Sequence, residues 1–475
     1  MPEVHSYSKR SRKSILAWPY FLHVLVCLAL GWIDSAGAAA PPAVGLAVPA
    51  LAIFDTVMKE MMRTNNVTAG ELGVMRYGVV VFHRSYGWQD QALTRLLAPD
   101  ALMRVGSVSK SFTAAAVRKL ISEGRLSLQD RVFSLGRAGT GILPHVPFLK
   151  PGAVLDERLA NITVQHCLQH TGGWDSDLVG DPMFREDQAA AELGVTSPPH
   201  TDEMLRWILG QPLQHNPGTT YAYANLGYMV LGLVIEKVSG QPYLACLRER
   251  VTRPIGILDS ELKSGEALLV DQDPREPYYA TSGLVDNLFY PAYSHLPKVE
   301  RPYGSFGMEH RKASGGLITN VRQLLLLAEH FTVFGNNVGT PWTRRGTVAK
   351  SGGLPGTSAF ISQRSDGINI AVICNRSGVA PDIAAAIVGL ITSGKIAKWP
   401  AVDPYALPPT APILQISPAP ANLRMATEPD RYYQILRATA LFQWEPWSPP
   451  FVGDGTDRTF SVGSGGPGPS FSRPP

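Results

Sequence analysis

The chain has 475 residues, of which 45% are hydrophobic, so it can bury a sizeable core in two or three domains or in one large one. Charged residues make up only 17% of the chain, and the formal net charge is +4. Part of that charge lies in the first thirteen residues, and no basic stripe with interleaved aromatic residues occurs elsewhere. This composition argues against nucleic acid as a partner.

The N-terminal segment has the pattern of an export signal. A cluster of Lys9, Arg10, Arg12 and Lys13 precedes the apolar run 15–33, and small residues follow at Ala36-Gly37-Ala38. This order predicts a signal peptide over residues 1–38, cleaved after Ala38. The apolar run is also long enough to span a bilayer as an uncleaved anchor. Both alternatives export the rest of the chain, with membrane contact only through this segment.

The predicted elements change in character along the chain. Strands and helices at both ends flank a mostly helical middle, and an irregular aromatic stretch covers residues 271–308. Helices are predicted over 53–63, from Ser107 to Gly124, over 162–170, 201–211, 225–240 and 241–251, after 320, and over 381–393. Strands are predicted in a hairpin over 70–88 that turns at Tyr77-Gly78, and over 346–377 with a turn at Asp366-Gly367.

This order predicts an α+β fold in which both ends of the chain build one α/β lobe, an antiparallel sheet flanked by helices. We assign residues 45–404 to this domain, with the α/β lobe at about 45–134 and 306–404 and an inserted helical lobe at about 135–305. Residues 405–475 are rich in proline and are predicted to be a flexible tail, in which 430–444 could form one docked helix.

Cysteine and histidine usage argues against a disulfide scaffold and a metal site. Beyond the export segment only Cys167, Cys246 and Cys374 remain, an odd number that allows at most one internal disulfide. His166 and His170 have a spacing that can hold zinc, but Cys167 stands where a metalloprotease would carry its glutamate. No third ligand is evident, so we expect no metal or other cofactor, and we interpret His170 as a structural residue that anchors a turn.

A candidate nucleophile lies at the start of the helix predicted from Ser107. Ser107 and Lys110 form Ser-x-x-Lys, and residues three apart share one face of a helix, so the amine can reach the hydroxyl. A lysine activates a serine only when desolvation or nearby positive charge keeps the amine partly neutral. The pattern alone is weak, because Ser6–Lys9 and Ser260–Lys263 match it as well.

Two further motifs strengthen this assignment. Tyr223-Ala224-Asn225 opens an apolar helix, where a tyrosine can relay a proton and an amide can orient the lysine and a substrate carbonyl. Alternatively, Tyr223 is a buried aromatic and Asn225 caps the helix. The segment Lys350-Ser351-Gly352-Gly353 lies in a predicted strand, where a glycine lets a substrate approach the backbone. A glycine turn between strands is the alternative for that segment.

With these three motifs in this order, the chain resembles the serine β-lactamase and penicillin-binding-protein superfamily, in particular class C β-lactamases and related esterases and D-amino-acid peptidases. The resemblance covers about residues 45–404. It includes "VGSVSKSFTAAAV", "ITVQHCLQHTGGW", "YAYANLGYMVLGLVIEKVSGQPY" and "KSGGLPGTSA". The third motif departs mildly from the family pattern Lys-Thr-Gly, because Ser351 replaces the threonine.

The resemblance implies a role for each motif residue. Ser107 would be acylated, while Lys110 and Tyr223 would share the roles of general base and acid. Asn225 would position the acyl group, and the backbone N–H groups of Ser107 and Gly353 would form the oxyanion hole beside Gly352. Lys350 and Ser351 would meet a carboxylate or polar end of the substrate.

We therefore expect an exported serine hydrolase that acts without metal or cofactor on a small-molecule or peptide substrate with an ester or amide carbonyl. Candidate substrates are a D-amino-acid peptide, a small ester and a β-lactam, and no motif reports the fast deacylation that a β-lactamase needs. The alternative from another class is a non-catalytic envelope protein that uses the cleft to bind cell-wall peptides. Intact Ser107, Lys110 and Tyr223 argue against it, since binding alone does not need all three.

Overall fold

The computed structural model describes residues 40–333 and 347–400, together with the backbone of eight short strands between residues 415 and 472. The predicted signal or anchor over residues 1–38 lies outside the described residues. In the part of the chain that is described, no helix is long and apolar enough to cross a membrane.

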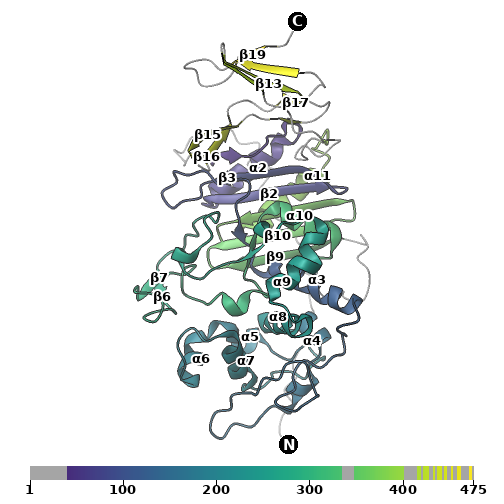
Figure 1. The fold of residues 1–475 in the computed structure, drawn as a ribbon, viewed down its shortest axis with the longest axis vertical. Helices are drawn as coiled ribbons and strands as arrows, with labels where there is room; N and C mark the ends of the chain where they lie inside the picture. The colour runs from purple at the N-terminus through teal and green to yellow at the C-terminus, as the bar shows by residue number, and fades with distance from the viewer. Residues whose placement is uncertain are drawn as a thin grey trace, which may run out of the picture. The chain divides into compact units, whose positions relative to one another are not determined.

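A six-stranded antiparallel sheet forms the centre of the fold (Figure 1). Its strand order is β1-β3-β2-β11-β10-β9, so strands from the two ends of the predicted catalytic domain meet at the pair β2–β11. The strands are β1 Ala43–Val44, β2 Ala69–Arg76, β3 Val79–Gly87, β9 Val348–Leu354, β10 Thr357–Gln363 and β11 Ile368–Cys374. The predicted α+β class is confirmed, and the short turns at Tyr77-Gly78 and Asp366-Gly367 join the strands as expected.

Helices cover both faces of this sheet, which explains why β11 is buried along its whole length. Because strand side chains alternate, Ile370 and Val372 face a core shared with α2 and α11, while Ala371 and Ile373 face a second core. That second core includes side chains of α3 and α10. The helices are α2 Ala52–Thr64, α3 Ser109–Ser122, α10 Val321–His330 and α11 Val379–Thr392.

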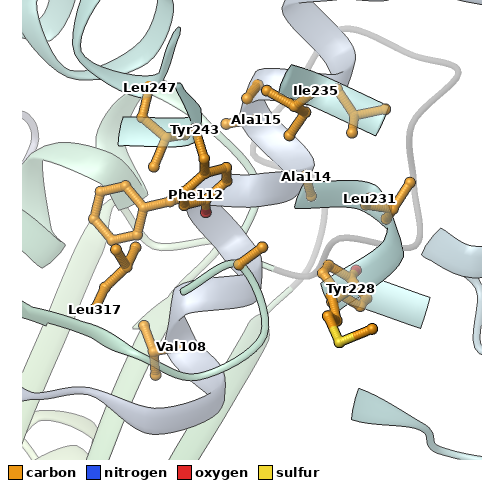
Figure 2. Close-up of a cluster of buried hydrophobic side chains, with 14 of the residues drawn as sticks. Val108, Phe112, Ala114, Ala115, Tyr228, Leu231, Ile235, Tyr243, Leu247 and Leu317 are labelled. Carbon is orange, nitrogen blue, oxygen red and sulfur yellow. The ribbon is translucent and has the colours of Figure 1, made fainter. Parts of the chain in front are cut away.

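The segment between β3 and β9 contributes most of the remaining helices. They are α4 Val164–Leu168, α5 Ser176–Val179, α6 Glu186–Leu193, α7 Thr201–Leu209, α8 Asn225–Ser239 and α9 Tyr243–Leu247. Figure 2 shows Phe112, Ala114 and Ala115 of α3 among side chains of α8 and α9 such as Leu231 and Tyr243. The small alanines let α8 approach the helix that carries the candidate nucleophile.

The irregular aromatic stretch is fastened to the strand that leads to Ser107. Arg104 is fully buried, forms an ion pair with Glu276 at 3.5 Å, and donates hydrogen bonds to the carbonyls of Pro302 and Glu266. The Tyr279 hydroxyl accepts from Arg104 N–H and donates to Glu276. Arg104 ends β4 (Met103–Arg104), three residues before Ser107, and β4 pairs with β8 (Leu317–Thr319), which also pairs with β5 (Lys263–Ser264).

Within the same stretch, a short hairpin is made of β6 Leu284–Asp286 and β7 Lys298–Glu300. The contacts of Arg104 with Glu276, Pro302 and Glu266 therefore hold the irregular segment beside β4.

In the C-terminal tail the expectation of a docked helix over 430–444 is wrong. The backbone there forms strands, because alternating residues such as those of "RATA" suit an extended chain as well as a helix. The eight strands are β12 Gln415–Pro418, β13 Ala421–Ala426, β14 Tyr432–Tyr433, β15 Leu436–Ala440, β16 Gln443–Pro446, β17 Phe451–Val452, β18 Asp457–Ser461 and β19 Ser470–Ser472, all paired antiparallel. The flexibility of the tail and the lobe boundaries stay predictions.

Candidate active site

Ser107 lies in a single 3₁₀ turn, Gly106–Val108, that runs directly into α3. The sequence predicts a helix that begins at Ser107, and the regular α-helix begins two residues later, at Ser109. Lys110 is in the first turn of α3, and its side chain is fully buried. Its Nζ lies 3.0 Å from Ser107 Oγ, so the two residues of Ser-x-x-Lys are in contact as predicted.

The edge strand β9 passes against this turn at unusually short range. A side chain at Gly352 would place its Cβ 2.0 Å from the carbonyl oxygen of Val105 and 2.8 Å from the backbone nitrogen of Ser107. A Cβ at Gly106 would lie 2.4 Å from the backbone nitrogen of Gly353. Both positions therefore require glycine, and the backbones of Ser107 and Gly353 lie next to each other. Because β9 is an edge strand, its outward N–H groups are not used by the sheet and are available as oxyanion donors.

The second motif completes the contacts of Ser107 and Lys110. Tyr223 Oη lies 2.7 Å from Ser107 Oγ, and Asn225 Oδ1 accepts a hydrogen bond from Lys110 Nζ at 2.7 Å. Asn225 is the first residue of α8, and its side chain does not cap the helix. Tyr223 is partly buried, with 37% of the residue exposed. The alternative in which Asn225 caps the helix is therefore wrong, and the role of Tyr223 stays a prediction.

Two contacts of this cluster were not predicted from the sequence. Asp181 accepts a hydrogen bond from Asn225 Nδ2 at 2.6 Å, and the carbonyl oxygen of Ser314 accepts from Lys110 Nζ at 2.5 Å. A carboxylate only accepts hydrogen bonds, so Asp181 fixes the orientation in which the Asn225 oxygen faces Lys110. Asp181 does not belong to any of the three motifs, so its position in the sequence does not indicate a role in the site. Ser314 acts through its backbone, which any residue type supplies.

The third motif contributes mainly through Lys350 and its two glycines. Lys350 Nζ lies 5.2 Å from the centre of the Tyr223 ring, and Lys110 Nζ lies 5.1 Å from it. Ser351 is exposed on β9, and no hydrogen bond joins its hydroxyl to the cluster within the described ranges. The structure thus brings seven of the eight predicted residues together and leaves the Ser351 side chain exposed at the edge of the sheet.

Burial lowers the pKa of both lysines of the site. Burial lowers the pKa of Lys110 well below its usual range, the positive charge of Lys350 lowers it further, and the negative charge of Asp181 opposes these effects. Burial also lowers the pKa of Lys350. Burial raises the pKa of Tyr223 to about 12 against the smaller opposing effect of its hydrogen bond to Ser107, so the phenol keeps its proton at neutral pH. Of the two groups in contact with Ser107 Oγ, Lys110 is therefore the candidate proton acceptor.

His170 is a structural residue, as the sequence predicts. It adopts φ +57°, its Nδ1 lies 3.2 Å from the carbonyl oxygen of Ala224, and its ring lies 4.6 Å from that of Tyr223. Burial and the positive charges of Lys110 and Lys350 lower the pKa of His170 to about 3. The imidazole is therefore neutral, and its ring packs against the ring of Tyr223.

The other histidine and lysine candidates have structural contacts. His166 takes part in the capping box of α4 with Thr163, and Lys263 of the second Ser-x-x-Lys forms an ion pair with Asp273 at 2.5 Å. Among residues 40–333 and 347–400, no group of three or more His, Cys, Asp or Glu side chains is placed to hold a metal ion.

Comparison with known proteins matches the chain to one family. The model of the family described as Beta-lactamase matches residues 54–372, which contain all three motifs. Esterase EstB of Burkholderia gladioli is 31% identical over 229 residues, which are 48% of this chain and 55% of the esterase. Protein flp of Staphylococcus aureus (strain COL) is 27% identical over 210 residues, 44% of this chain and 38% of that protein. The matches thus span about half or less of these curated relatives.

Two solved structures show the same β-lactamase/transpeptidase-like fold. The D-amino acid amidase of Ochrobactrum anthropi SV3 superposes with a TM-score of 0.51 at 15% identity, over 74% of this chain and 99% of the amidase. The beta-lactamase/D-alanine carboxypeptidase of Yersinia pestis superposes with a TM-score of 0.50 at 17% identity, over 74% of this chain and 100% of that one.

Proposed function

Because the chain belongs to the Beta-lactamase family, we propose that it is a serine hydrolase that cleaves an ester or amide through an acyl-enzyme at Ser107. The observation that carries this proposal is the position of Ser107 Oγ, 3.0 Å from Lys110 Nζ and 2.7 Å from Tyr223 Oη. A nucleophile in contact with both a base and a proton donor is the arrangement that acyl transfer requires.

The hydrogen bonds of Lys110 orient its lone pair. A neutral amine has two N–H bonds, and both Asn225 Oδ1 and the Ser314 carbonyl oxygen can only accept them. The lone pair is then left for the hydroxyl proton of Ser107, the third neighbour of Nζ. Asp181 contributes by keeping the oxygen of Asn225 turned toward the lysine.

Acylation follows from this arrangement. The Ser107 proton moves to Lys110 Nζ while Oγ bonds to the substrate carbonyl carbon, and the carbonyl oxygen takes the negative charge between the N–H groups of Ser107 and Gly353. When the tetrahedral intermediate collapses, the bond to the leaving group breaks, Tyr223 Oη donates its proton to the leaving group, and Lys110 returns a proton to Tyr223. Water then attacks the acyl-enzyme by the same transfers in reverse. The second N–H of Asn225 Nδ2 makes no hydrogen bond within the described residues and can contact the acyl group.

We further propose that the protein is exported, on the strength of the basic and apolar N-terminal segment. For the substrate we propose an ester or an amide of a D-amino-acid peptide or small molecule. Two relatives support these classes by name, an esterase by sequence and a D-amino acid amidase by fold.

Labelling of Ser107 tests the proposed function. We expect a fluorophosphonate or labelled penicillin to add one adduct to the wild-type protein, located by mass spectrometry on the peptide that carries Ser107. Ser107→Ala should give none, because it lacks the hydroxyl that is in contact with Lys110 Nζ. Equal labelling of both proteins would contradict the acyl-enzyme at Ser107, and no labelling of the wild type would favour the alternative of a peptide-binding envelope protein.

The pH dependence of the reaction reports the charge around Lys110. Activity needs the neutral amine, so the acidic limb of kcat/KM follows the pKa of Lys110. Lys350→Met removes a positive charge, which raises that pKa and moves the limb to higher pH. Asp181→Asn removes a negative charge, which lowers that pKa and moves the limb to lower pH. The measurement is kcat/KM for p-nitrophenyl acetate against pH.

Lys350→Arg is the control for this experiment, since it keeps the charge and should leave the limb close to its wild-type position. Shifts of Lys350→Met and Asp181→Asn in the same direction would contradict the assignment of the limb to Lys110.

A further inference from the structure

A cavity of about 690 Å³ opens beside the predicted oxyanion donor and is not used by the mechanism above. Its walls come from the end of β9 at Gly353 to Pro355, from the start of α11 at Gly378, from Phe184, and from the aromatic stretch at Arg301 and Phe306. Neither Ser107, Lys110, Tyr223 nor Lys350 lines it. It therefore begins where the carbonyl oxygen of a substrate would sit and extends away from the proton-transfer groups.

The direction of β9 tells which half of a substrate enters this cavity. Lys350 lies three residues before Gly353, beside the Tyr223 ring, and the cavity lies after Gly353 along the strand. At about 3.3 Å per residue, the two sides are about 10 Å apart. The leaving group must stay within reach of Tyr223 Oη, so it occupies the Lys350 side. The acyl half is then directed into the cavity.

The aromatic walls of the cavity are held by a buried ion pair. The guanidinium carbon of Arg311 lies 4.2 Å from the centre of the Phe184 ring and 5.2 Å from that of Phe306. Arg311 forms an ion pair with Glu186 at 2.5 Å, and both side chains are almost fully buried. The two rings meet edge to face with their centres 6.1 Å apart. Such fixed rings offer a preformed apolar surface to a flat or branched group.

The mouth of the cavity carries an unneutralised positive charge. Two charged residues line it, Asp286 and Arg301, and both are exposed. Asp286 is already paired with Lys298 at 2.5 Å. Arg301 has no ion pair or side-chain hydrogen bond within the described part of the chain. An anionic group on the ligand would supply the missing partner, and a guanidinium matches a carboxylate with two parallel hydrogen bonds.

We propose that this cavity binds the acyl half of the substrate and selects an aromatic or branched apolar acyl group that ends in a carboxylate. Phe184 and Phe306 contact the apolar part, and Arg301 pairs with the carboxylate. This inference rests on the proposed function and adds the substrate class to it. The aromatic stretch, which no sequence motif explained, becomes the wall that determines specificity.

Three esters with one leaving group test the inference: the p-nitrophenyl esters of acetic acid, phenylacetic acid and 4-(carboxymethyl)phenylacetic acid. We expect kcat/KM to rise about tenfold or more from acetyl to phenylacetyl, because a buried ring gains apolar contact. The added carboxylate should raise kcat/KM a further two- to fivefold, which is about what an exposed ion pair contributes. Added salt should weaken this second increase.

Two variants separate the two contacts. Arg301→Gln should abolish the preference for the carboxylate while the ratio of phenylacetyl to acetyl stays high, and Phe184→Ala should lower that ratio. Two controls should leave all three rates unchanged: Arg63→Gln, which removes a positive charge on α2, and Tyr293→Ala, which removes an exposed ring of the same aromatic stretch outside the cavity.

Equal kcat/KM for the three esters in a wild-type protein that hydrolyses the acetyl ester would overturn the inference and leave the proposed function standing. A carboxylate preference that survives in Arg301→Gln would overturn the assignment of Arg301. Absence of any turnover together with absence of an adduct at Ser107 would overturn the proposed function, and this inference with it.

Discussion

Replacing Lys110 with methionine is expected to slow acylation of Ser107 by about 10²- to 10⁴-fold, the range typical for loss of a general base. Methionine fills a similar volume but cannot accept the serine proton. It also leaves Asn225 Oδ1 and the Ser314 carbonyl oxygen without their donor. The rate of fluorophosphonate labelling, followed by mass spectrometry, measures this step directly.

Lys110→Arg distinguishes a base from a fixed charge. Arginine keeps the positive charge and the donors, but it stays protonated at every accessible pH. If Lys110 acts as the base, both variants lose labelling to a similar extent. Labelling by Lys110→Arg at close to the wild-type rate would show that only the charge matters. Thermal melts of both variants control for loss of the fold.

Gly352→Ala is expected to lower the activity by a similar factor, but by displacing the backbone of β9 rather than by removing a base. Its Cβ would lie 2.0 Å from the carbonyl oxygen of Val105 and 2.8 Å from the backbone nitrogens of Ser107 and Val108. These are backbone atoms, so β9 must move away from the turn that carries Ser107. Loss of one oxyanion donor costs about 10²- to 10³-fold in kcat, and overpacking costs about 1–3 kcal/mol of stability. The measurements are kcat for p-nitrophenyl acetate and the free energy of unfolding.

The adjacent glycine supplies the matched comparison. A Cβ at Gly353 would meet nothing closer than the carbonyl oxygen of Thr357 at 3.6 Å, and alanine keeps the N–H that the oxyanion hole needs. Gly353→Ala should therefore lose much less activity and stability than Gly352→Ala. Similar losses in the two variants would argue against the close approach of Gly352 to Val105 as the cause.

The sequence predicts much of the fold because its signals are local. The positive φ of Gly78, Gly124 and Gly367 marks turns and a helix end that glycine favours on its own, and the corresponding elements form where expected. Ser107 and Lys110 are predicted together because a helix fixes the distance between residues three apart. The exact start of α3 and the strands in the tail differ from expectation, because neighbouring chain segments decide such boundaries.

Other site residues could not be predicted, because their roles depend on which distant segments meet. In the sequence, Asp181 is an isolated acidic residue in a loop. Its role appears only in the fold, where its carboxylate accepts a hydrogen bond from Asn225. Ser314 contributes a backbone carbonyl that carries no sequence signal. Arg301 lines the cavity only because Arg104 and Arg311 fasten the aromatic stretch beside β9.

By itself, the sequence determined the residue types on which the proposed chemistry rests: a serine with a lysine one helical turn away, a tyrosine and an amide at a helix start, and glycines on a strand. Only the tertiary structure decided which groups lower the pKa of Lys110, how Asn225 is oriented, and which residues line the cavity beside Gly353. Residue type and local spacing can be read directly from the sequence. Burial, the sum of nearby charges and cavity shape depend instead on contacts between segments more than a hundred residues apart.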